Sequence, residues 1–158
     1  MRRKERDMEL LRLAIAAAHS ARENGNHPFG AVLADADGQW LLTAENTVVT
    51  ERDCTGHAET NLMRKASAIY DADFLSQCTL YTSTEPCAMC STAIFWGNVR
   101  RVVYALPETG LYDIVDESSE EVIQIPCREV FQKGKKAVVV EGPFLEEEAA
   151  LVHQGFWT

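Results

Sequence analysis

The chain has 158 residues and a mass of 17.6 kDa, which suits one compact domain with a sizeable core. Hydrophobic residues make up 46% and charged residues 25%, so neither a disordered nor a fibrous protein fits this composition. The formal net charge of -9 would repel a phosphate backbone over most of the surface, which disfavours a nucleic-acid partner. We therefore expect a single domain spanning residues 1–158.

The first predicted element is an amphipathic helix near the N-terminus. Charged residues interrupt its apolar run, so it resembles neither a secretory signal nor the ~18 apolar residues of a membrane span. The apolar side chains recur instead at helical spacing, at Leu10, Leu13, Ala14, Ala17, Ala18 and Ala21. We expect a soluble, cytoplasmic protein, in which five cysteines suit metal binding or catalysis better than disulfide bonds.

Strand-like and helix-like segments alternate along the rest of the chain. "FGAVLAD" and "QWLLTAENTVV" read as two strands of a hairpin, with the turn residues Asp35, Asp37 and Gly38 between them. The later elements are predicted as a helix over 57–70, a strand over 78–83, a helix over 87–97, a strand over 100–105, an irregular acidic region over 107–128, a strand over 136–142 and a helix over 145–156. This order predicts an α/β fold, a three-layer α/β/α sandwich with a central mixed five-stranded sheet.

The segment "TEPCAMC" places Cys87 and Cys90 three positions apart behind Pro86. Residues i and i+3 lie on one face of a helix, and a helix N-terminus favours the thiolate form that binds metals. Two thiolates do not complete a zinc site, and the remaining cysteines form no second C-x-x-C pair; they are Cys54, Cys78 and Cys127.

His57 is the better third ligand, because it opens the preceding predicted helix in "GHAETN". Three protein ligands would leave the fourth tetrahedral position to water, as in a catalytic zinc site. Glu59 follows two positions later and could reach the same cavity without binding the metal. Zinc lowers the pKa of bound water toward ~7, and a neighbouring carboxylate can then move the proton.

The combination of "HAE" and "PCAMC" is the signature of zinc nucleobase deaminases. From about Leu10 to Tyr104 the sequence resembles the cytidine-deaminase superfamily, within its branch of guanine, cytosine and tRNA adenosine deaminases. The resemblance implies a zinc cofactor bound by His57, Cys87 and Cys90. It also implies that zinc-bound hydroxide attacks the ring carbon carrying the amine, while Glu59 shuttles protons to the ring nitrogen and to the departing ammonia.

The same resemblance suggests residues that contact the substrate. Asn46 would hold the base through its side-chain amide, and the backbone amide of Ala58 would contact it as well. Phe29 and Trp96 could form apolar walls for a flat ring, although aromatic residues in these elements also suit an ordinary core.

Phe156 and Trp157 lie near the chain end, where residues usually fray unless they are docked. We expect these two side chains to close an active site, either in their own chain or in a neighbouring one. The resemblance and the apolar segments "AIFWGNV" and "ALVHQGFW" together predict a homodimer.

Guanine, converted to xanthine and ammonia, is the substrate to which the resemblance points, with cytosine as the main competitor. A tRNA adenosine deaminase would need a basic groove or tail, yet the C-terminal "LEEEAALVHQGFWT" contains no Lys or Arg. A non-catalytic, zinc-stabilised interaction module would not need Glu59. A small-molecule nucleobase or nucleoside is therefore the expected partner.

Guanine presents N–H donors that need acceptors once they are buried. The acidic region after Tyr104 offers carboxylates, of which Asp113 falls nearest to an acidic residue that similar guanine deaminases place at their pocket; the others are Glu108, Asp116 and Glu117. A carboxylate in such a region is more often solvated on a loop, and this is the favoured interpretation of Asp113 itself. Differences in this region leave a modified purine, a pterin or a triazine as further possibilities.

Overall fold

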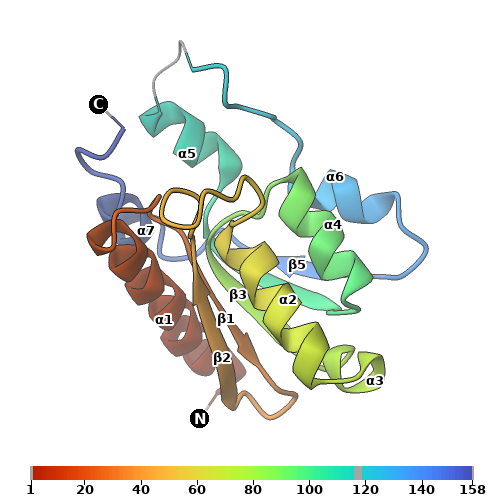
Figure 1. Cartoon of the computed structure of the whole chain (residues 1–158). Helices are drawn as coiled ribbons and strands as arrows, with labels where there is room; N and C mark the ends of the chain where they lie inside the picture. Colours follow the sequence, from red (N-terminus) through yellow and green to blue (C-terminus); the bar gives the residue numbers. More distant parts are fainter. Residues whose placement is uncertain (1, 116–118, 158) are drawn as a thin grey trace.

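The computed structural model describes residues 2–115 and 119–157. Over these residues a five-stranded sheet, in the order β2-β1-β3-β4-β5, lies between two layers of helices (Figure 1). The strands are β1 (Gly30–Ala34), β2 (Trp40–Glu45), β3 (Thr79–Thr84), β4 (Arg101–Leu106) and β5 (Val139–Glu141). The helices are α1 (Arg3–Glu23), α2 (Ala58–Ile69), α3 (Ala72–Leu75), α4 (Ala88–Trp96), α5 (Glu108–Ile114), α6 (Cys127–Gln132) and α7 (Glu146–Leu151). The predicted three-layer α/β/α sandwich is confirmed.

The sheet is mixed, as predicted. β1 pairs antiparallel with both β2 and β3, whereas β3–β4 and β4–β5 are parallel pairs. The β1–β2 hairpin closes at the predicted turn, where the Asp35 carboxylate accepts hydrogen bonds from the backbone of Asp37 and Gln39, each at 2.9 Å. Gly38 has a φ of +80°, a conformation that glycine adopts without strain.

Each face of the sheet has its own apolar core, because successive strand residues point to opposite faces. Leu80 of β3 packs on the side of α2, α4 and α6, and Tyr81 packs on the side of α1 and α7 (Figure 1). α1 crosses β1 so closely that a Cβ atom on Gly30 would lie 2.3 Å from the backbone oxygen of Ala14. This position therefore requires glycine.

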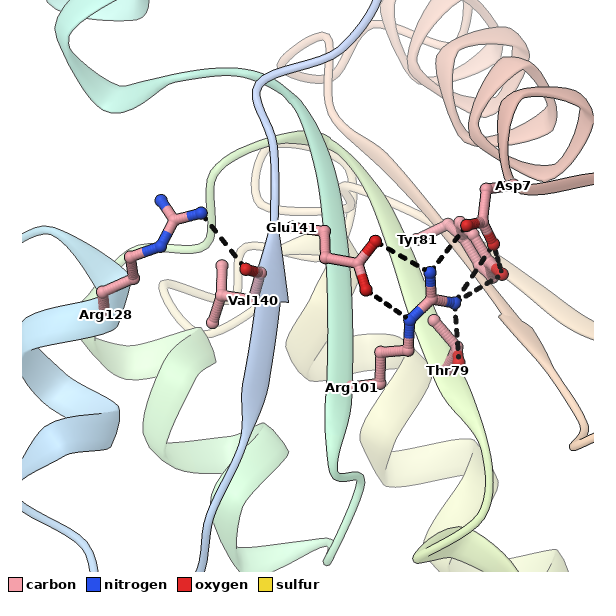
Figure 2. Close-up of polar contacts among 7 residues, drawn as sticks. All are labelled: Asp7, Thr79, Tyr81, Arg101, Arg128, Val140 and Glu141. Carbon is pink, nitrogen blue, oxygen red and sulfur yellow. Dashed lines mark hydrogen bonds and ion pairs between the residues drawn. The ribbon is translucent and has the colours of Figure 1, made fainter. Parts of the chain in front are cut away.

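A partly buried ion-pair network ties α1 to the amino-terminal end of β4 and to β5 (Figure 2). The Arg101 guanidinium lies 2.6 Å from the Asp7 carboxylate and donates two hydrogen bonds of 3.1 Å to Glu141. The hydroxyl of Tyr81 donates to Asp7 at 2.6 Å. The network lies at the opposite end of β4 from α5. It explains why Asp7, an acidic residue, lies on the buried face of α1.

The structure corrects three of the predicted element boundaries. The second strand ends at Glu45, because the backbone N–H of Val48 bonds to the side chain of Asn46 and that of Thr47 bonds to the loop before α2. The region expected to be irregular contains α5 and the start of α6. The last helix ends at Leu151, and turns follow it. Of the acidic candidates in the irregular region, Asp116 and Glu117 lie outside the described residues.

In the described parts of the chain, no helix has both the length and the hydropathy needed to cross a membrane. All five cysteines are free thiols. Cys78 packs in the core on the α2 side, Cys127 begins α6 within the same core, and Cys54 is exposed on the loop before α2.

Candidate active site

Two helices begin at the same end of the sheet, and their first residues include the predicted metal ligands. His57 is the N-cap residue of α2, and Cys87 is the N-cap residue of α4. Cys90 lies one turn into α4 and is fully buried. Because α2 and α4 pack side by side on the same face of the sheet (Figure 1), their starts bring these three side chains together.

The three side chains have the spacing of a zinc site. The Nδ1 atom of His57 lies 3.5 Å from the Sγ atom of Cys87, and all three candidate ligand atoms lie within 4.8 Å of one another. A tetrahedral zinc ion with bonds of 2.0–2.3 Å separates neighbouring ligand atoms by roughly 3.3–3.8 Å. The donor set therefore fits zinc, and three protein ligands leave a coordination position for water or substrate.

The two thiols influence each other strongly. A hydrogen bond from Cys90, followed by one from His57, lowers the pKa of Cys87 to about 4, although burial opposes this shift. The same hydrogen bond to Cys87, together with burial, raises the pKa of Cys90 well above its usual range. The bond to Cys87 also raises the pKa of His57. The hydroxyl of Thr60 lies 3.2 Å from the Cys90 sulfur and provides a further hydrogen-bond partner.

Glu59 lies in the first turn of α2 and is only 6% exposed. Burial and the neighbouring Cys87 raise its pKa to about 7, while the nearby His57 and a hydrogen bond with Thr82 act in the opposite direction. A carboxyl group in this place can hold or release a proton near neutral pH.

The loop between β2 and α2 is fixed by a residue that the sequence analysis did not single out. The side-chain amide of Asn61 donates to the backbone oxygens of Glu45 and Gly56, at 3.0 and 3.3 Å, and to the hydroxyl of Thr47 at 2.9 Å. These bonds hold the loop that carries Asn46 and leads into His57. No sequence signal marked Asn61, because its partners come from outside its own helix.

Three of the predicted substrate contacts lie at the same end of the sheet. Asn46 directly follows β2, is buried, and donates its backbone N–H to the carbonyl oxygen of Phe29 at 3.1 Å. Phe29 directly precedes β1 and is partly buried. Ala58 is the first residue of α2, where the backbone N–H has no partner within the helix.

Trp96 lies away from this group, and Asp113 is an exposed residue of a helix near it. Trp96 ends α4, eight positions beyond its first residue, so it is displaced from Cys87 by roughly 13 Å of helix, and its side chain is 77% exposed. Asp113 lies on α5 and is exposed. The structure therefore does not bring Trp96 together with the metal ligands within one chain.

Glu85 joins the metal-binding segment to two later helices. Its carboxylate accepts a hydrogen bond from the backbone of Glu108 at 2.8 Å and another from the backbone of Cys127 at 2.9 Å. It thereby caps the first turns of both α5 and α6. Glu108 itself is partly buried, and burial, with the charges of Glu85 and Cys87, raises its pKa to about 7.

Residues 4–106 match the family described as the cytidine and deoxycytidylate deaminase zinc-binding region. The chain belongs to this family. It is a zinc-dependent deaminase, and the side chains positioned to hold the metal ion are His57, Cys87 and Cys90.

Relatives of this deaminase act on different bases. It is 39% identical to a probable cytosine deaminase of Schizosaccharomyces pombe over 97% of its own length and 93% of that protein. It is 36% identical to a guanine deaminase of Bacillus subtilis over 71% of its length and 78% of that protein. A solved structure from a study of A-to-I editing by tRNA:A34 deaminases has 28% identity and a TM-score of 0.73, and the match covers 92% of this chain and 99% of that one.

Proposed function

We propose that this deaminase hydrolyses the exocyclic amine of a free nucleobase and that guanine is its substrate, with xanthine and ammonia as products. The observation that carries the hydrolytic activity is a buried carboxyl group, Glu59, beside a three-ligand metal centre. A non-catalytic zinc-stabilised module would have no use for this costly burial of a carboxyl group. We therefore rank the enzyme above the interaction module.

Each side chain has a defined task in this proposal. Zinc, held by His57, Cys87 and Cys90, supplies a Lewis acid that lowers the pKa of a bound water. Glu59 is placed to accept the proton that the attacking water loses and to donate it to the ring nitrogen, and then to move the remaining proton of the added hydroxyl group to the amine, which leaves as ammonia. Asn46 and the backbone N–H of Ala58 orient the base.

Guanine and cytosine each have one observation in their favour. Glu108 is a partly buried carboxyl group whose pKa responds to the charge of Cys87, so it is a candidate acceptor for the N–H donors of guanine. Cytosine is favoured by the S. pombe relative, because that match also includes the C-terminal third of the chain. We place guanine first and keep cytosine as the second candidate.

The deciding experiment measures ammonia release by the zinc-loaded protein from guanine, guanosine, cytosine, cytidine, adenine, adenosine and a tRNA anticodon stem. We expect guanine to be turned over with a kcat/KM of ~10⁴ M⁻¹s⁻¹ or more, roughly the lower end for physiological substrates. Turnover of cytosine or of the RNA at this level, with guanine inactive, would overturn the assignment.

We also propose that the protein works in the cytoplasm as a homodimer and does not bind nucleic acid. Five free thiols suit a reducing compartment, and the net charge of -9 opposes a phosphate backbone. The exposed indole of Trp96 is suited to a subunit interface.

A further inference from the structure

A groove lies between α6 and β5, away from the three metal ligands. Its volume is about 460 Å³, and it is lined by α6, by the loop that follows this helix and by β5. The charged side chains that line it are Arg128, Lys135 and Lys136, and no acidic residue of the described chain lines it. Sites for small molecules commonly measure roughly 300–1,000 Å³, so the groove has room for such a ligand.

The positive charge of the groove contrasts with the rest of the molecule. Residues 126–138 contain four basic residues and one acidic residue, Glu129, whereas the whole chain carries a net charge of -9. Within the described residues, no ion pair includes Arg128, Lys135 or Lys136. Three cations without a counter-charge in one hollow will attract an anion to this place.

Arg128 reaches from α6 to β5 (Figure 2). Its Nη2 atom donates to the backbone oxygens of Val140 and Gly142, at 3.2 and 3.3 Å, and its Nη1 atom donates to the hydroxyl of Tyr104 at 3.0 Å. These three acceptors are neutral, so they hold the guanidinium in place without cancelling its charge. Its Nε–H donates to no described acceptor, and a guanidinium is well suited to bind phosphate oxygens.

The loop after α6 is anchored on α4. The Nζ atom of Lys136 donates to the backbone oxygen of Phe95 at 2.8 Å and to the side chain of Asn98 at 3.2 Å. A Cβ atom on Gly134 would lie 2.3 Å from the Phe95 ring, so the loop packs closely against this side chain. Because these contacts already fix the loop, a ligand would have little of it to order on binding.

The same loop offers donors that the protein itself does not use. Lys135 is exposed and has no hydrogen-bond or ion-pair partner in the described part of the chain. The backbone N–H groups of residues 135–138 also donate to no described acceptor. A phosphate group accepts several hydrogen bonds and carries the opposite charge. Val138 and Val140 line the groove beside these donors and add apolar surface for an attached organic group.

We propose that the groove between α6 and β5 binds a small organic phosphate, with the phosphate group among Arg128, Lys135 and Lys136. The cations and the loop N–H groups bind the phosphate, and the valine side chains contact the organic part. This site is separate from the metal centre, and the proposal does not depend on which base the protein deaminates.

The test titrates the zinc-loaded full chain with inorganic phosphate, ribose 5-phosphate and ribose at constant ionic strength. In ¹H–¹⁵N NMR spectra, ribose 5-phosphate should cause saturable shifts of the amides of residues 135–138 and bind about 5-fold more tightly than inorganic phosphate, because it also contacts the apolar wall. Ribose should cause no shift. Equal affinity for the two phosphates would overturn the organic ligand, and shifts confined to the metal centre would overturn the site.

Lys135→Glu and Lys133→Glu form a matched pair of variants. Both exchange an exposed lysine of the same segment for glutamate, but Lys133 does not line the groove. Lys135→Glu should weaken ribose 5-phosphate binding by about 10-fold or more, and Lys133→Glu by less than about 2-fold. Equal weakening would show a general effect of net charge and overturn the site. Binding of hexaglutamate or of an RNA stem to the loop, with no effect of ribose 5-phosphate, would also overturn it.

Discussion

Glu59 combines near-complete burial with a place beside the three metal ligands. We expect Glu59→Gln to keep its fold and its zinc while losing turnover by ~100-fold or more, because a carboxamide has the same shape but cannot carry the proton. Ammonia release and elemental analysis measure the two effects. Glu51→Gln, at an exposed position of the loop before α2, is the control. Activity near the wild-type level would remove Glu59 from the mechanism.

The two cysteines of α4 should be required for metal binding. A Cys87→Ser, Cys90→Ser double variant loses both thiolates, and a single histidine cannot retain zinc against dialysis. We expect elemental analysis to find less than a tenth of the zinc of the wild-type protein. Cys54→Ser, which changes an exposed thiol, should keep one zinc per chain. Full zinc in the double variant would contradict the ligand set.

The sequence predicted which residues carry the chemistry. It did not predict which residues hold the surrounding loops and helices in place. His57 and Cys87 were recognisable because the metal fixes both the residue types and their short spacing. Asn61 and Glu85 were missed because their partners are backbone groups of distant segments. His27 was not singled out from the sequence, since nothing local reveals that the chain end packs on it.

At the scale of elements, the Glu85 carboxylate caps the first turns of both α5 and α6. Glu85→Ala should remove both caps and lower the free energy of unfolding by ~2 kcal/mol, about twice the cost of one cap. Urea unfolding measures this loss, and hydrogen exchange should show weaker protection in both α5 and α6.

Asp71→Ala is the matched control for Glu85, because Asp71 caps only α3, through a bond of 2.8 Å from the backbone of Phe74. It should cost ~1 kcal/mol and loosen α3 alone. An equal cost for the two variants, or protection lost in only one of α5 and α6, would contradict the double cap.

Long periodic elements were predicted well and short ones were not. The 21 residues of α1 repeat their apolar spacing several times, whereas α3, α5 and α6 have seven residues or fewer, too few to establish a period. These helices are stabilised by caps and packing instead. The second strand was predicted too long for a related reason: Thr47 and Val48 have strand-forming side chains, but their backbone groups bond within the loop.

At the scale of the whole molecule, burial of His153 makes stability depend on pH. Its side chain is 1% exposed, and burial lowers its pKa to about 4. Below pH ~6.5 the unfolded chain binds a proton that the folded chain does not, so stability is present above this pH and is lost as the pH falls toward 4. At pH 5 the loss should be ~2 kcal/mol.

Urea unfolding of zinc-loaded protein at pH 7 and pH 5 measures this effect. His153→Gln keeps an acceptor for Trp157 but cannot bind the proton, so the difference between the two pH values should shrink by ~2 kcal/mol. His19→Gln, an exposed change on α1, should retain the wild-type difference. The same pH dependence in His153→Gln and in the wild-type protein would show that His153 is not the group responsible.

The exposed indole of Trp96 is the candidate contact for the proposed homodimer. Trp96 is 77% exposed at the end of α4, and Asn98, just beyond it, is hydrogen-bonded to the backbone of α3 at 2.8 Å, so the end of α4 is tied to α3 (Figure 1). Burying this indole between two copies would remove apolar area from water.

We expect light scattering to give twice the chain mass of 17.6 kDa for the wild-type protein and the chain mass for Trp96→Asp. Trp40→Asp changes another exposed indole, 52% accessible on the edge strand β2, and should remain dimeric. A monomeric wild-type protein, or a dimeric Trp96→Asp, would rule out this interface.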